Sequence, residues 1–399
     1  MTNGKRKIAL IYGGRGCEHS VSLAGAKYVR GLISKEKYDL LNVFIDKTGV
    51  WWLTGEASND SAKAQRAGGK ASLNNADALR AGGKASNDSA ASRAGGEALH
   101  NNAAARLDRK GGNSTKSESS ELGSRGTEVF PIRMGGASGL FDGETTIPVD
   151  CAIPLLHGDF GEDGRIQGAL DTAGIPFIGA STVAGALCID KAFTKAVARE
   201  LGIPVARGKS LPCGAKYGDA LLAAKEIGFP VFVKPRRLGS SVGAGIARDG
   251  GELKEAFARA EPYGEIMLEE LIEQKRELEI GLLSLKDGLI ISPVGEVVCG
   301  GFYDFDKKYG SQTETRTRAD ISLSVAEKIR EYAQGLARAI SLFGPMRIDF
   351  FLCGERLIFN EINTMPGFTA DSLYPALMRE AGIEGEALFD LLIGDALGE

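Results

Sequence analysis

The sequence predicts a protein of mixed α/β and α+β class, with an open, largely parallel sheet first and a module richer in antiparallel strands after it. Three observations lead to this prediction. Apolar strand-like segments alternate with helical ones up to Ser181, apart from an insertion over residues 56–126. Hairpin-like strands follow later in the chain. The 399 residues are 43% hydrophobic, enough for one large core or roughly two to three smaller ones.

The first predicted element is a strand at "KIALIY", followed by a helix in "HSVSLAGAKYVRGLI", where apolar residues recur with helical spacing. "YDLLNVFI" predicts a second strand, and two more are predicted at "EVFPIR" and "VDCAIPLLHG". A helix over 165–173 and a short strand at "PFIG" come next. This alternation predicts helices on both faces of the sheet.

Helices are then expected between Ser181 and Leu201, followed by a helix–strand pair at "DALLAAKEIG" and "PVFVKP". Four strands are expected next, at "SVGAGIA", "EIMLEEL", "ELEIGLLSL" and "LIISPVGEVV". A last helix over 322–342 leads into two strands, "PMRIDFFLC" and "RLIFNEINT", which the turn "GE" separates.

The insertion over 56–126 differs from the rest of the chain. It contains no aromatic residue, and "RAGGKAS" occurs at Arg66 and again at Arg80, with "RAGGEAL" at Arg93. This repeat is too short for a solenoid unit with its own hydrophobic face. The composition cannot bury enough apolar area to offset the entropy of ordering, so we predict a disordered surface insertion. A docking segment for a partner is the alternative.

Composition excludes several classes of protein. Lys and Arg (48) nearly balance Asp and Glu (52), which argues against bulk attraction to nucleic acid or to anionic lipid. The first apolar run ends at Tyr12, too short for a signal or membrane segment. Six scattered cysteines and three histidines favour a reduced, cytoplasmic protein over a disulfide frame or a histidine-rich metal site.

One candidate metal site lies in "MRIDFFLCGERLIFNEINT". Glu361 and Asn363 point to the same face of a strand because side chains alternate, and Asp349 joins that face if the two strands form a hairpin. Three oxygen ligands without histidine or cysteine suit Mg²⁺. The alternative is a group of polar residues at the end of a sheet. We favour the metal because unpaired carboxylates in apolar strands would be costly to bury.

Two further segments carry candidate binding groups. Lys234 ends a strand and precedes a Gly/Ser-rich turn over Gly239–Gly243, a combination that can wrap phosphates but that could also be an ordinary β-turn. After the first strand, "YGGRGCEHSVS" lacks the glycine spacing of a dinucleotide-binding loop. Its Glu18 could recognise a ligand or could simply compensate the dipole of the following helix.

These segments together resemble the D-alanine–D-alanine ligase family of the ATP-grasp superfamily. The matching motifs are "GGRGCEHSVSL", "LLHGDFGEDGRIQG", "IDKAFTK", "VFVKPRRLGSSVG", "FYDFDKKYG", "MRIDFF" and "NEINTMPGFTADSLYP", in the family's order. The resemblance implies an N-terminal α/β substrate domain over 1–183 and a two-lobed ATP-grasp fold. Its central lobe would span 184–275, and its C-terminal lobe, 276–399, would hold the magnesium site and a lid.

The resemblance implies a set of residues that bind ATP and metal. Lys191, Lys234 and Lys308 resemble the lysines that contact the phosphates, and Glu277 resembles the carboxylate that holds the ribose hydroxyls. Asp349, Glu361 and Asn363 match the ligands of two Mg²⁺ or Mn²⁺ ions. The strand-like linker expected against the adenine consists of Glu269, Glu270 and Leu271.

The resemblance also implies a substrate site for two molecules of D-alanine. Glu18 is similar to the group that anchors the first amino group, with Ser240 and Tyr309 in support. Arg347 and the backbone N–H of Gly367 resemble an oxyanion hole, and Ser372 resembles the contact to the second carboxylate. His157 resembles a histidine near the first substrate, with an ordinary strand-end histidine as the alternative.

The implied reaction activates one D-alanine as an acylphosphate with ATP, and the amine of a second D-alanine then attacks it. The segment "YDFDKKYG" would be a lid that keeps water from the acylphosphate. The family further implies a homodimer and a role in peptidoglycan precursor synthesis. The rivals are a D-alanine–D-lactate ligase, which Tyr309 disfavours, another ATP-grasp carboxylate–amine ligase and a nucleotide-binding regulatory protein.

Overall fold

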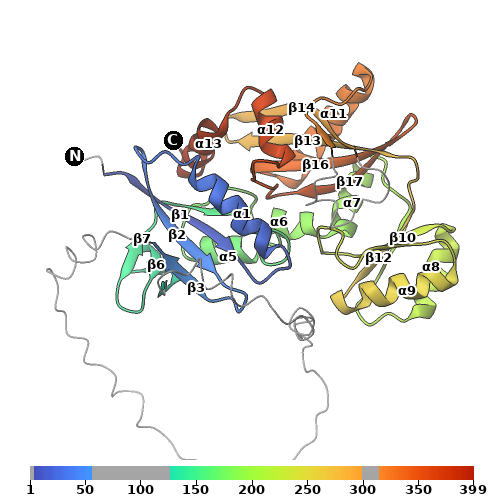
Figure 1. Ribbon diagram of the computed structural model, residues 1–399, viewed down its shortest axis with the longest axis horizontal. Helices are drawn as coiled ribbons and strands as arrows, with labels where there is room; N and C mark the ends of the chain where they lie inside the picture. Colours follow the sequence, from blue (N-terminus) through green and yellow to red (C-terminus); the bar gives the residue numbers. More distant parts are fainter. Residues whose placement is uncertain (1–3, 56–125, 299–313) are drawn as a thin grey trace, which may run out of the picture. The chain divides into compact units, whose positions relative to one another are not determined.

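The computed structural model describes residues 4–55, 126–298 and 314–399. All of these except Gly55 belong to one compact unit of the chain. Its main sheets are an N-terminal, a central and a C-terminal sheet, and Figure 1 shows the labelled helices and strands in sequence colours.

The N-terminal sheet has the strand order β4-β3-β2-β1-β8, in which β1 pairs in parallel with both β2 and β8. The outer strands β3 and β4 pair antiparallel, so the predicted parallel sheet is right for its centre and wrong for this edge. The segment "PFIG" forms a single bridge, Ala152 with Phe177, and not the predicted strand. The strands are β1 (Arg6–Gly13), β2 (Tyr38–Ile45), β3 (Trp51–Thr54), β4 (Thr127–Glu128) and β8 (Cys151–Pro154).

Helices cover both faces of this sheet, as predicted. Ile8 and Leu10 of β1 pack with α1 (His19–Arg30), whereas Ala9 and Ile11 pack with α5 (Arg165–Thr172). The alternation arises because successive side chains of a strand point to opposite faces. A small antiparallel sheet, which the sequence did not predict beyond "EVFPIR", consists of β5 (Phe130–Met134), β6 (Ala137–Phe141) and β7 (Thr146–Pro148).

The central sheet has the order β11-β10-β12-β9, and all its pairings are antiparallel. Its apolar face packs against α8 and α9, which lie on the same side of it in Figure 1. The other face of β10 and β12 is therefore available to a ligand. The elements are β9 (Gly208–Leu211), α8 (Tyr217–Ile227), β10 (Val231–Pro235), β11 (Gly245–Ala247), α9 (Gly250–Ala260), a 3₁₀ turn (Glu261–Tyr263) and β12 (Ile266–Glu270).

The C-terminal sheet has the order β15-β14-β13-β16-β17. Leu278 and Ile280 of β13 pack with α11 on one face, which leaves Glu277 and Glu279 on the other. The predicted helix over 322–342 is present as α11 but is not the last one, because α12 and α13 follow the strands. The elements are β13 (Arg276–Leu285), β14 (Gly288–Val298), β15 (Glu314–Arg316), α11 (Leu323–Ile340), β16 (Gly344–Cys353), β17 (Arg356–Asn363), α12 (Leu373–Glu380) and α13 (Gly385–Leu397).

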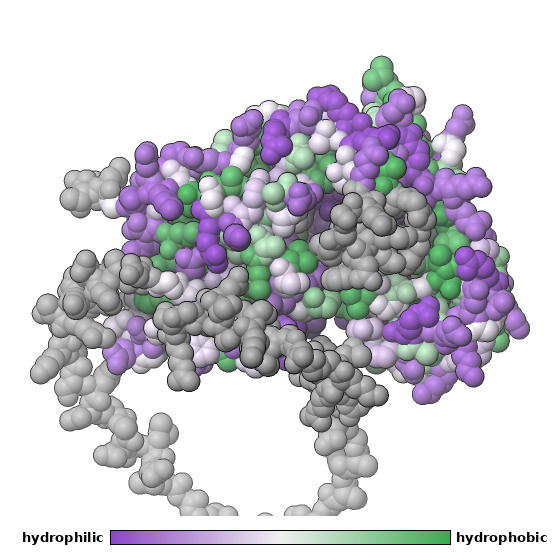
Figure 2. Space-filling view, viewed as in Figure 1, coloured by the Kyte–Doolittle hydropathy of each residue, from purple (hydrophilic) through white to green (hydrophobic). Residues whose placement is uncertain are grey.

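Two short helices connect the N-terminal sheet to the central one, α6 (Thr182–Ile189) and α7 (Lys191–Glu200), as predicted between Ser181 and Leu201. Figure 2 shows hydrophilic side chains over much of the visible surface, with hydrophobic ones scattered between them. Within the described residues, we find no helix that combines the length and the apolar character needed to cross a membrane.

Candidate active site

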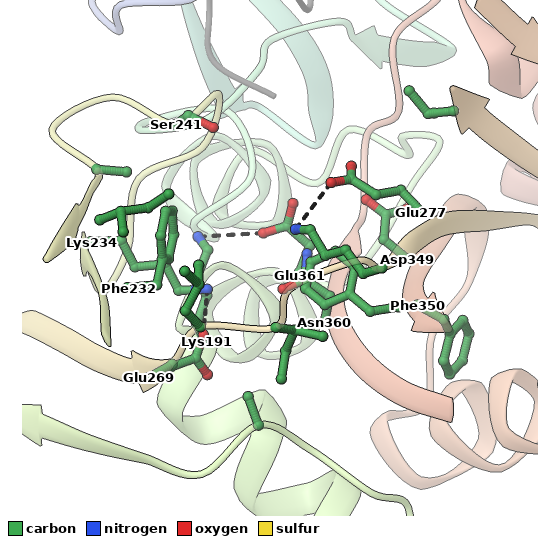
Figure 3. Close-up of a pocket in the computed structure, with 18 of the residues that line it drawn as sticks. Lys191, Phe232, Lys234, Ser241, Glu269, Glu277, Asp349, Phe350, Asn360 and Glu361 are labelled. Atoms are coloured by element: carbon green, nitrogen blue, oxygen red, sulfur yellow. Dashed lines mark ion pairs between the residues drawn. The ribbon is translucent and has the colours of Figure 1, made fainter. Parts of the chain in front are cut away.

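A cavity of about 690 Å³ lies between the free face of β10 and β12 and the polar face of β13, β16 and β17. Its volume lies within the range typical of small-molecule and cofactor sites. In Figure 3, Lys234 of the central sheet and Asp349 and Glu361 of the C-terminal sheet line this space, together with Lys191 of α7. Among the residues predicted to bind ATP or metal, those that line the cavity are Lys191, Lys234, Glu269, Glu270, Leu271, Glu277, Asp349 and Glu361.

Glu269 is a buried carboxylate held between two lysines. Its Oε2 lies 2.7 Å from Nζ of Lys234, and its Oε1 accepts from Lys195. Lys234 and Glu269 share a face because Lys234 is two residues beyond Phe232, the register partner of Glu269. Burial acts to raise the pKa of Glu269, but Lys195 and Lys234 lower it to about 2. The group therefore carries two positive charges and one negative charge.

Lys195 was missed by the sequence analysis, although it lies four residues after Lys191 in "IDKAFTK". It belongs to α7, its side chain is 1% exposed, and burial lowers its pKa to about 8 while Glu269 opposes that shift. The signal that could have identified it is the spacing of four, which puts both lysines on one face of a helix. A second lysine in the helix was compatible with ordinary solvent exposure, so the sequence did not single it out.

Lys191 extends across the cavity toward the C-terminal sheet. Its Nζ donates to the carbonyl oxygen of Leu238 at 2.7 Å and lies 3.6 Å from Oε2 of Glu361. Burial lowers the pKa of Lys191, and the nearby charge of Lys234 acts in the same direction. Lys191 thus lies between the Gly/Ser-rich turn and the predicted metal ligands, in a position to contact a phosphate group.

The predicted metal ligands share one face of the hairpin β16–β17, because a register shift at Asn360 brings Glu361 opposite Asp349. Asp349 pairs in register with Glu361, and Asn363 pairs with Arg347. The amide Nδ2 of Asn363 donates to Oδ2 of Asp349 at 3.0 Å. Three oxygen-bearing side chains from two paired strands suit Mg²⁺ or Mn²⁺, so the residues present fit a divalent cation. Whether they bind one stays a prediction.

Arg347 contacts Asp349 and a second carboxylate, Glu279, that the sequence analysis missed. It forms two hydrogen bonds of 2.8 Å to Asp349, and its Nε lies 3.0 Å from Oε2 of Glu279. Burial acts to lower the pKa of Arg347, but Asp349 and Glu279 raise it well above its usual value. Glu279 lies directly opposite Asp349 on the neighbouring strand β13, a pairing that no local sequence pattern reveals.

The Gly/Ser-rich turn adopts an unusual backbone. Ser240 and Ser241 both have positive φ values, 51° and 57°, which non-glycine residues seldom adopt. Such local strain is typical of ligand-binding segments. Ser240 Oγ donates to Oε1 of Glu18, and both residues are buried. Glu18 is the N-cap residue of α1 but makes no side-chain capping bond to it, and it lies beside Ser240, as the resemblance implies.

Asp190 ties the start of α7 to the strand that carries Lys234. It accepts hydrogen bonds from the backbone N–H groups of Ala192 and Phe193, and it also binds Nε of Arg236 at 2.5 Å and of Arg237 at 2.9 Å. Burial acts to raise the pKa of Asp190, but these donors lower it. This buried carboxylate therefore fixes Lys191 relative to the Gly/Ser-rich turn.

The residues predicted for the nucleoside lie along the end of β12 and the start of β13. Glu277 is paired with Lys275, their charged atoms being 3.0 Å apart. Glu270 pairs with Arg207 and Arg356, and the backbone N–H of Leu271 donates to the carbonyl of Pro230. The side chain of Glu269 pairs with Lys195 and Lys234, and the place of its backbone in the linker against the adenine stays a prediction.

The residues predicted for the second substrate lie beyond β17. A side chain at Gly367 would come within 2.9 Å of Ser372 Oγ, so these two residues are close neighbours. Ser372 Oγ also accepts from the backbone N–H of Thr369 at 3.0 Å.

His157 Nδ1 bonds to the carbonyl oxygen of Met365 at 3.0 Å. This bond is compatible with a histidine near the first substrate and with an ordinary strand-end histidine. Lys308 and Tyr309 lie outside the described residues.

Comparisons with known families and structures agree with this geometry. The family model described as D-ala D-ala ligase N-terminus matches residues 7–180, and that described as D-ala D-ala ligase C-terminus matches residues 197–394. A D-alanine–D-alanine ligase of Chlorobium phaeovibrioides is 34% identical over 401 residues, covering 98% of this chain and 96% of the relative. One of Mycolicibacterium smegmatis is 34% identical over 405 residues, covering 99% and 96%.

Solved structures show the same fold. The D-alanine–D-alanine ligase of Coxiella burnetii is 26% identical, with a TM-score of 0.74 over 99% of this chain and 94% of that one. The VanG D-Ala:D-Ser ligase of Enterococcus faecalis is 28% identical, with a TM-score of 0.73 over 98% of this chain and 100% of that one. These neighbours confirm the predicted two-part architecture with an ATP-grasp fold. From its family matches and its near-full-length relatives, the chain belongs to the D-alanine–D-alanine ligase family.

Proposed function

We propose that this ligase uses ATP to join two molecules of D-alanine through a D-alanyl phosphate intermediate. The observation that carries the proposal is the cavity itself, where Lys191 and Lys234 face Asp349 and Glu361 across one space. Such a site can hold a polyphosphate between cations on one side and a metal-binding carboxylate pair on the other.

ATP would lie with its phosphates against Lys191, Lys234 and the turn around Ser240. Because Glu269 is shared by two lysines, Lys234 keeps an uncompensated part of its charge for phosphate oxygens. Glu277 would accept hydrogen bonds from the ribose hydroxyls, and Lys308, outside the described residues, would add a further phosphate contact.

Asp349, Glu361 and Asn363 would hold Mg²⁺ or Mn²⁺, two ions in all, which when bound neutralise charge on the phosphates. Glu18 would bind the ammonium group of the first D-alanine and place its carboxylate near the terminal phosphate. Arg347 and the backbone N–H of Gly367 would stabilise the oxyanion that forms when the second amine attacks. Ser372 would bind the carboxylate of that second D-alanine.

The acceptor is the point at which related enzymes differ, since the Enterococcus faecalis neighbour is a D-Ala:D-Ser ligase. We propose D-alanine as the acceptor here, with D-serine and D-lactate as the alternatives. Tyr309 would favour an amine acceptor by hydrogen bonding toward Ser240 and Glu18. We further propose a cytoplasmic homodimer that serves peptidoglycan precursor synthesis.

The test is phosphate release from ATP, measured with D-alanine, with L-alanine and without an amino acid. We expect release with D-alanine alone, accompanied by D-alanyl-D-alanine as the product. Release that does not depend on D-alanine would overturn the proposal. Adding D-serine or D-lactate beside D-alanine and identifying the products distinguishes the acceptors, and Tyr309→Phe should relax that choice.

A further inference from the structure

Arg347 is shared by carboxylates on adjacent strands of the C-terminal sheet. Its Nε lies 2.8 Å from Oδ1 of Asp349 and 3.0 Å from Oε2 of Glu279. All three side chains are nearly buried, with 11% to 12% of their surface exposed. Asp349 also receives the second hydrogen bond of the guanidinium, at 2.8 Å, so its carboxylate is the closer partner.

Asp349 thus has a positive partner at the place where the proposed function requires a metal ligand. A divalent cation on this carboxylate would compete with the guanidinium for its oxygens and would repel it. A buried guanidinium that lost Asp349 would be left unpaired unless another carboxylate were within reach. Glu279 is already in contact with Nε of Arg347.

We propose that Glu279 is a positioning residue that keeps Arg347 paired and in place when Asp349 binds a divalent cation. The inference rests on the proposed function, because it takes Asp349 as a metal ligand. Glu279 lowers the cost of separating Arg347 from Asp349 and so strengthens metal binding. It also keeps the guanidinium on the face of the sheet where an oxyanion would form.

A direct role of Glu279 as a metal ligand is the competing explanation. Within the described residues, no three His, Cys, Asp or Glu side chains are grouped so that they could hold a metal ion. Glu279 lies opposite Asp349 in the strand register, and its Oε2 lies 3.0 Å from Nε of Arg347. The geometry therefore assigns Glu279 to the arginine.

The test measures Mn²⁺ affinity by electron paramagnetic resonance, with a non-hydrolysable ATP analogue and without turnover. Glu279→Gln keeps the side-chain size and is expected to weaken Mn²⁺ binding about tenfold. Arg347→Met removes the competing cation and is expected to tighten binding about threefold or more. An unchanged affinity in Glu279→Gln overturns the inference.

The double variant separates the two explanations. In the Arg347→Met background, Glu279→Gln is expected to change Mn²⁺ affinity by less than about twofold, because the group through which it acts is gone. A loss as large as in the wild type means that Glu279 acts on the metal directly, which overturns the inference. If the wild type binds no Mn²⁺, the metal site of the proposed function is wrong and this inference falls with it.

Glu296→Gln is the matched control. It also removes the carboxylate of an arginine–glutamate pair in this sheet, with a buried Glu296 and a partly exposed Arg276 at 2.7 Å, but Glu296 does not line the cavity. It should leave Mn²⁺ affinity unchanged. Circular dichroism and melting curves check that each variant is folded. If Arg347→Met does not fold, Arg347→Gln replaces it as a second variant with an uncharged side chain.

Discussion

The Nζ atom of Lys234 lies 2.7 Å from Oε2 of Glu269, and the same carboxylate binds Lys195 of the helix α7. The side chains of Lys195 and Glu269 are 1% and 5% exposed, and that of Lys234 is 10% exposed. Because the three groups carry a net positive charge in a nearly dry environment, they form a strong site for an anion.

Replacing Lys195 by Met should weaken ATP binding, because Glu269 would then neutralise Lys234 alone. We expect KM for ATP to rise about tenfold and the free energy of unfolding to fall by about 2 kcal/mol. Steady-state kinetics and urea unfolding check these values. The control is Lys209→Met, which removes an exposed pair with Glu226 and should cost less than about 1 kcal/mol without changing KM. An unchanged KM in Lys195→Met would contradict this role.

The pH dependence of KM for ATP should reflect Lys195. Its pKa is lowered to about 8 by burial, so its ammonium is present at pH 7 and is lost as the pH rises through about 8. We expect KM to increase between about pH 8 and pH 10. In Lys195→Arg, whose guanidinium stays protonated, this increase should be absent or moved to higher pH. Identical profiles for the two proteins would show that another group titrates.

Removing the carboxylate of Asp190 should disturb both the helix α7 and the Gly/Ser-rich turn. Asp190→Ala loses the helix cap and leaves Arg236 without this partner, so we expect a loss of about 3 kcal/mol and a higher KM for ATP. Asp190→Asn should lose less of the free energy of unfolding, because the amide oxygen can still cap the helix. The control Asp249→Ala removes the cap of α9, where the carboxylate accepts from the backbone N–H of Glu252. It should cost about 1 kcal/mol and leave KM unchanged.

Deleting residues 58–124 should leave catalysis intact. Leu53 of β3 and Thr127 of β4 are register partners, so the two ends of the insertion leave adjacent antiparallel strands. A short loop can close such a pair. We expect kcat and KM within about twofold of the full chain, because surface loops of different length differ little in closure entropy. A large loss of turnover would assign the repeats a role in catalysis.

The deletion must retain Gly126. A Cβ atom at this position would lie 2.5 Å from the carbonyl oxygen of Leu53, so Gly126→Ala should destabilise the protein where the deletion does not. Thermal melting of the two variants provides the comparison.

Some of the site could be predicted from local sequence. Side-chain alternation placed Glu361 and Asn363 on one face, and the two-residue turn predicted the hairpin itself. A regular register from that turn would pair Asp349 with Asn360, and the β-bulge that brings Asp349 opposite Glu361 was not predicted. The apolar runs and their spacing predicted the principal strands and helices, because the periods of a strand and of a helix also follow from local backbone geometry. Short elements such as β3 and β9, and the late helices α12 and α13, were missed because tertiary contacts stabilise them more than their own periodicity does.

The sequence by itself determined which groups were available and on which face of a strand or helix they would lie, since those depend on backbone geometry over a few residues. The tertiary structure alone decided how they pair. Ser240 contacts Glu18 from 222 residues away, and Lys195 contacts Glu269 from 74 residues away. Ion pairs of this kind depend on burial and on the packing of separate elements, and neither leaves a pattern in the local sequence.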